Sequence, residues 1–229
     1  MASKLAQAAY VFPIGANIQM ASTGDTTKNY ATGNYNWQVG THPIIAFILP
    51  PPMVGPTPAV PATRCATTAS PDQHCYAFYA FYAMKRSDYV GTDVAPKATG
   101  ADNPGINSAN DPTAWVLMEY RGYYSNLATS YAGTGFSQFV TEIPMGNRGR
   151  LLMDYLVPYS PSPATQLFLT NVTQTLPNSQ VAGVATVTMN LAALQSVAQQ
   201  IIRVPAGTTT TYSTLTVYPR NVGKTQLSN

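Results

Sequence analysis

The stretch CYAFYAFYAM, residues 75–84, constrains the fold more than any other part of the chain. Aromatic enrichment and nearby prolines favour a β-strand over a helix for a short apolar run of this kind. Alternate side chains of a strand point to opposite faces, so this strand is apolar on both faces and needs cover on both. We expect one face to enter the core and the other to meet either the loop 50–74 or a neighbouring subunit. The large side chains concerned are Tyr76, Phe78, Tyr79, Phe81 and Tyr82.

Short segments rich in Thr, Val, Tyr, Phe and Ile recur along the whole chain, separated by turn residues. This habit is typical of an all-β sandwich or barrel. A chain of 229 residues with no break in composition is expected to form one such domain, residues 1–229. The predicted strands are 9–14, 35–39, 43–49, 75–84, 114–121, 136–143, 150–157, 166–173, 181–189 and 209–219.

Helical periodicity is confined to residues 190–202. Leu191, Leu194 and Ala198 recur at helical spacing after Asn190, a suitable N-cap, whereas the β-branched residues 201 and 202 leave the end open to a strand. The sequence therefore predicts at most one notable helix. Two segments are expected to be long loops: 50–74, which is dense in Pro, and 91–112, which is dense in Gly, Asn, Asp and Pro.

The chain carries unusually little charge. Asp, Glu, Lys and Arg make up 9% of its residues, against about 25% in an ordinary soluble domain. Weak surface charge indicates a chain that packs against copies of itself, and the alternative is a neutral, hydroxyl-rich surface of a secreted or wall-associated protein. The net charge of +3 and the absence of a basic arm argue against direct binding to nucleic acid.

The start, MASKLAQAAYVFP, lacks the apolar core and cleavage pattern of a signal peptide. The apolar stretch PIIAFILPPPMV is broken by prolines and falls short of the ~18 apolar residues of a membrane span. We therefore expect the chain to be made and kept in the cytoplasm, or to leave the cell by a route other than a cleaved signal.

Residues that could perform chemistry are few and scattered. Glu119 and Asp154 are the two carboxylates within clear strand patterns, where a rigid scaffold could hold a catalytic pair. We favour two separate carboxylates, paired with residues such as Arg121 and Arg150. His42 precedes a proline at the start of a strand and is expected in a turn, with no Gly-x-Ser-x-Gly motif to partner it. We predict no enzymatic activity, no catalytic residue, no metal and no cofactor.

Cys65 and Cys75 flank the segment ATTASPDQH. They form either a disulfide, which would stabilise the fold by ~2–3 kcal/mol, or two buried thiols. His74 adjoins Cys75, which is poor spacing for zinc ligands. GNRGR, 146–150, is expected to be a hairpin turn, with a small anion contact as the alternative, and Asn171 fits an N-glycan acceptor that matters only in a glycosylating compartment.

With these features together, the chain resembles the single jelly-roll capsid proteins of tailless icosahedral DNA viruses of bacteria or archaea. The resemblance covers the whole length and lies in the many short strands, the long loops, the low charge, the unprocessed start and the closing strand at 209–219. It involves no diagnostic motif. The missing basic N-terminal arm departs from RNA-virus coats and favours coats that enclose an internal membrane.

The resemblance implies a jelly-roll-like β-sandwich or barrel with long loops that self-assembles into an icosahedral shell. The implied location is the virion. The implied partners are copies of the chain, other capsid proteins and an internal viral membrane beneath the shell, without direct sequence-specific binding to nucleic acid. Two other functions remain open: an extracellular carbohydrate-binding or adhesive β-module, and a hydrolase that uses Glu119 and Asp154.

Overall fold

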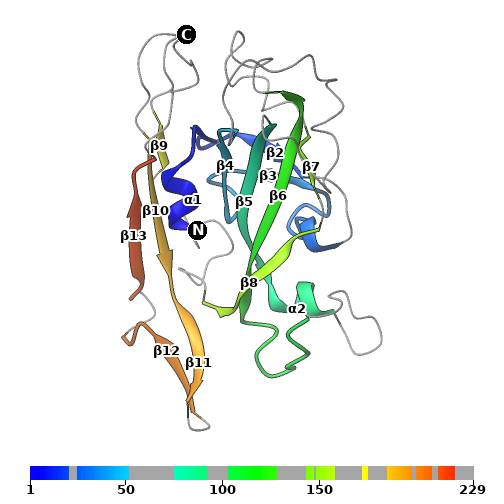
Figure 1. Cartoon of the computed structure of the whole chain (residues 1–229). Coiled ribbons are helices and arrows are strands. Elements are labelled where there is room, and N and C mark those ends of the chain that lie inside the picture. Colours follow the sequence, from blue (N-terminus) through cyan, green and yellow to red (C-terminus); the bar gives the residue numbers. More distant parts are fainter. Residues whose placement is uncertain are drawn as a thin grey trace.

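The computed structural model describes residues 1–20, 25–51, 75–91, 103–127, 143–146, 148–157, 172–174, 185–197, 200–207 and 211–219. Within these residues the chain is all-β, with two five-residue helices, α1 (Ala2–Ala6) and α2 (Arg86–Val90), and a 3-10 turn at Asp25–Thr27 (Figure 1). The predicted class, an all-β sandwich or barrel without a long helix, is confirmed. The strands are β1 (Tyr10–Val11), β2 (Asn17–Gln19), β3 (Asn36–Gln38), β4 (Ile44–Leu49), β5 (Cys75–Lys85), β6 (Trp115–Leu127), β7 (Met145–Gly146), β8 (Arg150–Leu156), β9 (Val172–Gln174), β10 (Ala185–Leu191), β11 (Ala193–Val197), β12 (Gln200–Val204) and β13 (Ser213–Val217).

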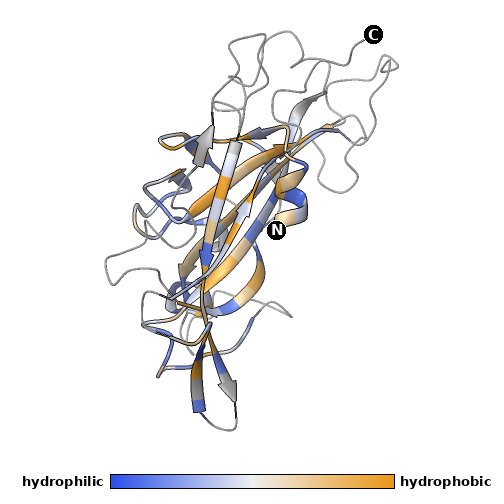
Figure 2. Ribbon diagram, turned by 90° about the vertical axis from the view of Figure 1, so that its left-hand side faces the viewer, coloured by the Kyte–Doolittle hydropathy of each residue, from blue (hydrophilic) through white to orange (hydrophobic). Residues whose placement is uncertain are grey.

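The described strands form three antiparallel sheets. An 8-stranded sheet has the order β1-β4-β5-β6-β8-β11-β12, with β7 paired to β6 beside this path. A 3-stranded sheet has the order β13-β10-β9, and β2 and β3 form a 2-stranded sheet, called the β2–β3 hairpin below although its connection is long. Neighbours along the large sheet follow chain order, as in a meander, whereas a Greek key returns a later strand beside the first. Figure 2 shows hydrophobic residues concentrated along the central strands.

One face of β5 packs on the chain's first and last elements. Its odd-numbered side chains, among them Tyr79 and Phe81, join a cluster with Leu5 of α1, Met189 of β10 and Val217 of β13. Phe47 on β4 stacks on Tyr79 with ring centroids 5.7 Å apart. The small sheet and α1 therefore cover this face, which gives the sandwich its first core.

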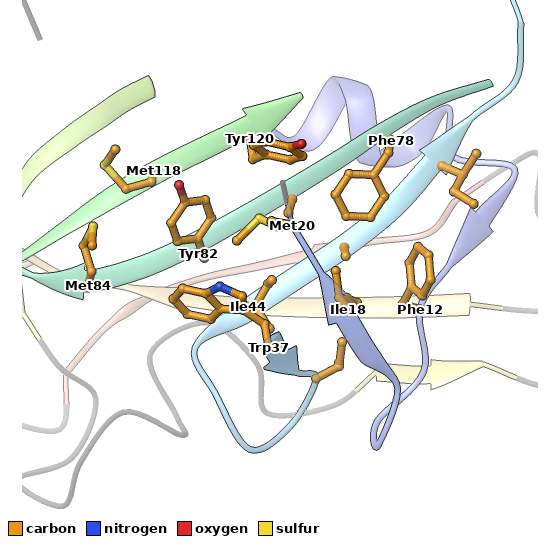
Figure 3. Close-up of a cluster of buried hydrophobic side chains, with 14 of the residues drawn as sticks. Phe12, Ile18, Met20, Trp37, Ile44, Phe78, Tyr82, Met84, Met118 and Tyr120 are labelled. Carbon is orange, nitrogen blue, oxygen red and sulfur yellow. The ribbon is translucent and has the colours of Figure 1, made fainter. Parts of the chain in front are cut away.

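The opposite face of β5 packs on the β2–β3 hairpin and the segment before it (Figure 3). Phe78 meets Phe12 edge to face at 5.8 Å, and Tyr82 meets Trp37 at 5.0 Å between ring centroids. Ile18 of β2 closes the same cluster. The second cover predicted for this strand therefore exists, and the β2–β3 hairpin supplies it.

The five aromatic side chains singled out on this strand are all core residues. Their exposed fractions run from 0% to 5%: Tyr76 4%, Phe78 0%, Tyr79 5%, Phe81 1% and Tyr82 0%. A neighbouring subunit therefore has almost no surface of these side chains to contact, and the strand gives no information about partners. The loop first expected to cover it, 50–74, lies outside the described residues from residue 52 onward.

The helix predicted at 190–202 is wrong. The structure forms β11 and β12 there, paired from Ala193 with Val204 to Val197 with Gln200. Ala193 also pairs with Leu156 of β8, which attaches the hairpin to the large sheet. Sheet pairing, within the hairpin and at Ala193 to β8, outweighs the weak helix preference of Ala, Leu and Gln, and the β-branched residues at 201 and 202 fit a strand better.

The other predicted segments agree with the structure where it describes them. The strands predicted at 43–49, 114–121, 150–157 and 209–219 correspond to β4, β6, β8 and β13, with boundaries shifted by a few residues. The predicted strand 136–143 and most of 166–173 lie outside the described residues. Of the expected loop 91–112, residues 103–112 contain only turns and irregular backbone.

Candidate functional site

The two carboxylates considered for catalysis lie in separate ion pairs. Glu119 on β6 accepts hydrogen bonds at both oxygens from Lys4 Nζ, each 3.0 Å long. Asp154 on β8 accepts from Arg86 Nε at 2.8 Å and from Arg86 Nη2 at 3.1 Å. Separate pairing was expected and is confirmed, although the partners are Lys4 and Arg86 rather than Arg121 and Arg150.

Arg86 is the centre of a buried polar cluster that the sequence did not indicate. Its side chain is 1% exposed, bonds to Asp111 and Asp154, and donates from Nη2 to the Gly105 carbonyl at 2.7 Å. Its guanidinium lies 4.7 Å from the ring centroid of Tyr155. Burial acts to lower the pKa of Arg86, but hydrogen bonds to Asp154 and Asp111 outweigh it and raise the pKa. The cluster is fully paired, so it ties α2 and residues 103–111 to β8.

His42 lies in a turn, as predicted. Its Nδ1 accepts a hydrogen bond of 2.7 Å from the Gln38 backbone N–H, so the ring is neutral in this arrangement. The ring stands edge-on to Trp37, and burial lowers the pKa of His42. Within the described ranges no group of three or more His, Cys, Asp or Glu residues is placed to hold a metal ion.

Cys75 is 1% exposed and disulfide-bonded. Cys65 lies outside the described residues, as do His74 and Asn171. The pairing of the two cysteines and the glycosylation of Asn171 therefore remain predictions.

The GNRGR segment packs against the core through its second glycine. The Gly149 N–H donates to Thr26 Oγ1 at 3.0 Å, and Tyr82 Oη donates to the Thr26 carbonyl at 2.6 Å. A Cβ on residue 149 would overlap Tyr82 Oη. The segment thus fixes a close approach between residues 26, 82 and 149, while Arg148 and Arg150 are exposed.

A pocket of about 210 Å³ opens between residues 29–31 and the end of β5. Both tryptophans of the chain line it, and Trp37 already donates its indole N–H to the Thr27 carbonyl at 3.0 Å. Its other aromatic and polar lining residues are Asn29, Tyr30, Lys85, Asp88 and Trp115. These residues are far apart in sequence and belong to no motif, so only the fold brings them together. The volume fits a single ring, because ordinary ligand pockets measure about 300–1,000 Å³.

The β11–β12 hairpin is the candidate assembly site. Figure 1 shows that it extends beyond β10 and β13 at one end of the molecule. Among the described strands β12 pairs only with β11, so its outer edge has no partner strand there. On β12 the side chains of Ile202 and Val204 are 41% and 44% exposed. An unpaired edge with exposed apolar side chains is a template for pairing with another chain.

No protein-family model, curated protein or solved structure matches the chain. In the described part of the chain, no helix has the length and apolar character needed to cross a membrane.

Proposed function

We propose that the chain is a structural capsid subunit that assembles with copies of itself into a closed viral shell. The observation that carries this proposal is the β11–β12 hairpin, whose β12 edge has no partner among the described strands and whose Ile202 and Val204 are exposed. Proteins that remain monomeric protect such edges with charges, prolines or a covering loop. The only charged residue of β12 is Arg203, which is half-buried.

The charge distribution supports close association between copies. Lys4 is paired with Glu119, and Arg86 with Asp111 and Asp154, so several of the few charges are already paired inside the subunit. Surfaces with little net charge approach each other without strong repulsion. The N-terminal segment also fits a shell role better than a nucleic-acid arm, because Leu5 is 1% exposed and packs in the core.

A closed shell needs more than one kind of contact, since a single two-fold contact ends at a dimer. Other large apolar side chains are exposed on separate elements, including Ile14 at 59%, Leu215 at 42% and Tyr218 at 65%. They could supply these further contacts. The large sheet runs as a meander. The support for assembly therefore comes from the exposed surface and not from a jelly-roll order of strands. Other capsid proteins and an internal membrane remain the proposed further partners.

Assembly is tested by light scattering after gel filtration and by negative-stain electron microscopy, over a range of concentration and salt. We expect pentamers, hexamers or shells. Ile14→Lys is a useful companion variant, because it changes an exposed residue outside the hairpin and should impair larger assemblies without unfolding the subunit. A chain that stays monomeric at high concentration in every salt would contradict the proposal.

The pocket beside Trp37 and Trp115 favours a second function, carbohydrate binding. Aromatic faces combined with Asn29, Lys85 and Asp88 suit a sugar ring, which has apolar C–H faces and hydroxyl edges. Its small volume limits it to one ring. Trp115→Ala should abolish glycan binding measured by calorimetry on a monomer, and binding of no glycan by the unaltered chain would exclude this function.

A further inference from the structure

We infer that β12 pairs in antiparallel fashion with β12 of a second copy of this chain, about a two-fold axis at Ile202. The pairing would join the hairpins of two copies into one four-stranded sheet, with β12 strands in the middle and β11 strands outside. It rests on the proposed function, for which it supplies one of the required contacts.

The register of the hairpin shows which backbone groups face the open edge. Val197 pairs with Gln200, which leaves a two-residue connection, and the closing pair of such a hairpin is hydrogen-bonded. Bonded and non-bonded pairs then alternate along the ladder. Gln195 and Ile202 therefore bond to each other, while the N–H and C=O groups of residues 201 and 203 point outward.

A two-fold axis at Ile202 places these outward groups opposite one another. Residue 201 of each copy faces residue 203 of the other, and the two facing residues can exchange both backbone hydrogen bonds. The two Ile202 residues then form the non-bonded central pair. The alternation of bonded and non-bonded pairs in the β11–β12 hairpin is therefore compatible with this axis, and no β-bulge is needed.

The side chains along β12 favour the same axis. Ile202 and Val204 lie on one face of the strand, since they are two residues apart. Across the axis the two Ile202 side chains face each other, and each Val204 lies opposite Gln200 of the other copy and diagonal to its Ile202. Side chains that are 41% and 44% exposed in one subunit would shield each other from water in the pair.

Charge identifies the occupant as a second copy. Arg203 is folded back on its own chain, with its guanidinium 4.8 Å from the ring centroid of Tyr212 and Nη1 donating to the Pro205 carbonyl at 3.3 Å. In this register the two Arg203 residues are not opposite each other, so like charges do not face across the strands. The one charge on β12, Arg203, is held against its own chain by these contacts, and an antiparallel strand edge is self-complementary under two-fold symmetry.

Cysteine cross-linking tests the axis directly. Non-bonded antiparallel pairs have Cα atoms about 4.5 Å apart, within the range of about 4.4–6.8 Å that a disulfide spans. Ile202→Cys should therefore give a covalent dimer after mild oxidation, seen on a non-reducing gel. The matched control is Ile106→Cys, at a similarly exposed position (39%) outside the strands, and the unaltered chain controls for Cys65 and Cys75. Failure of Ile202→Cys to form a dimer, or equal yields from both variants, would overturn the pairing.

A second variant keeps the test independent of the thiol. Ile202→Lys places two ammonium groups opposite each other and removes the central apolar pair, so dimerisation should weaken at least about tenfold while circular dichroism stays unchanged. Unchanged dimerisation would overturn the pairing. If the chain forms shells but Ile202→Cys gives no cross-linked dimer, only the β12 pairing is rejected. If Ile202→Cys gives the cross-linked dimer but the chain never forms larger assemblies, only the capsid function is rejected.

Discussion

Gly149→Ala should strongly destabilise the subunit, although it adds only one methyl group. The new Cβ would overlap Tyr82 Oη and lie 3.2 Å from Tyr82 Cζ and 3.0 Å from the Thr26 carbonyl oxygen. Tyr82 is fully buried against Trp37 and holds the same Thr26 carbonyl through its hydroxyl, so it has no free direction in which to move. The close approach of these groups therefore requires glycine.

The size of the effect follows from two losses. Forcing an extra carbon into a filled core costs about 1–3 kcal/mol, and displacing the Tyr82 hydroxyl from Thr26 costs a further ~0.5–1.5 kcal/mol. We expect the free energy of unfolding to fall by about 1.5–4.5 kcal/mol, measured by urea denaturation followed by circular dichroism.

A double-mutant cycle separates this overlap from a general loss of backbone freedom. In a Tyr82→Phe background the overlapping oxygen is absent, so Gly149→Ala should cost at least about 1 kcal/mol less than in the unaltered chain. Gly33→Ala is the control, because a Cβ there meets open space and only its φ of +73° opposes the change. Additive effects in the cycle, or a smaller loss for Gly149→Ala than for Gly33→Ala, would refute the reasoning.

Four further substitutions probe the two cores and the polar contacts. Phe78→Ala and Phe81→Ala should each lower the free energy of unfolding by about 3–5 kcal/mol in urea titrations, because both faces of β5 are buried, and a neutral result for either would contradict this. Arg86→Met should lower the free energy of unfolding by about 3–5 kcal/mol in the same assay, because it leaves the carboxylates of its two aspartate partners without a positive charge beside them. Burial holds the pKa of His42 below its ordinary 6.5. The contribution of neutral His42 to the free energy of unfolding is therefore full above pH 6.5 and is lost as the pH falls through the folded-state pKa. His42→Gln should reduce the dependence of the free energy of unfolding on pH, measured by urea titrations between pH 7.5 and 5.

Local signals predicted the central strand well and its surroundings poorly. The predicted strand 75–84 and the observed β5, Cys75–Lys85, nearly coincide, because aromatic content and alternation are properties of the segment itself. The need for cover on both faces also follows from those residues. The residues of β5 do not show which segments provide the cover. The covering strands β2, β3, β10 and β13 are distant from β5 in sequence, and only the folded chain brings them to it.

The same limit explains the errors at the hairpin and the polar cluster. The segment 190–202 carries helical spacing, but its two halves pair with each other as β11 and β12, and Ala193 also pairs with Leu156 of the distant β8. Arg86 could be seen as a charge at the end of a strand, while its partners Asp111 and Asp154 are brought to it by two separate segments. Pairings that depend on tertiary contacts leave no local pattern to read.

The burial of β5 changes where self-association has to occur. The aromatic row of this strand would have been the strongest reason for a subunit interface, yet the chain covers it with its own hairpin and its own C-terminal strands. Among the edges of the described strands, that of β12 offers backbone groups together with two exposed apolar side chains of the same strand. Because backbone pairing is directional, contact through this edge fixes the angle between two subunits, whereas contact through a hydrophobic patch alone would not. A shell of defined curvature needs such fixed angles, so the hairpin suits that role better than the buried strand could.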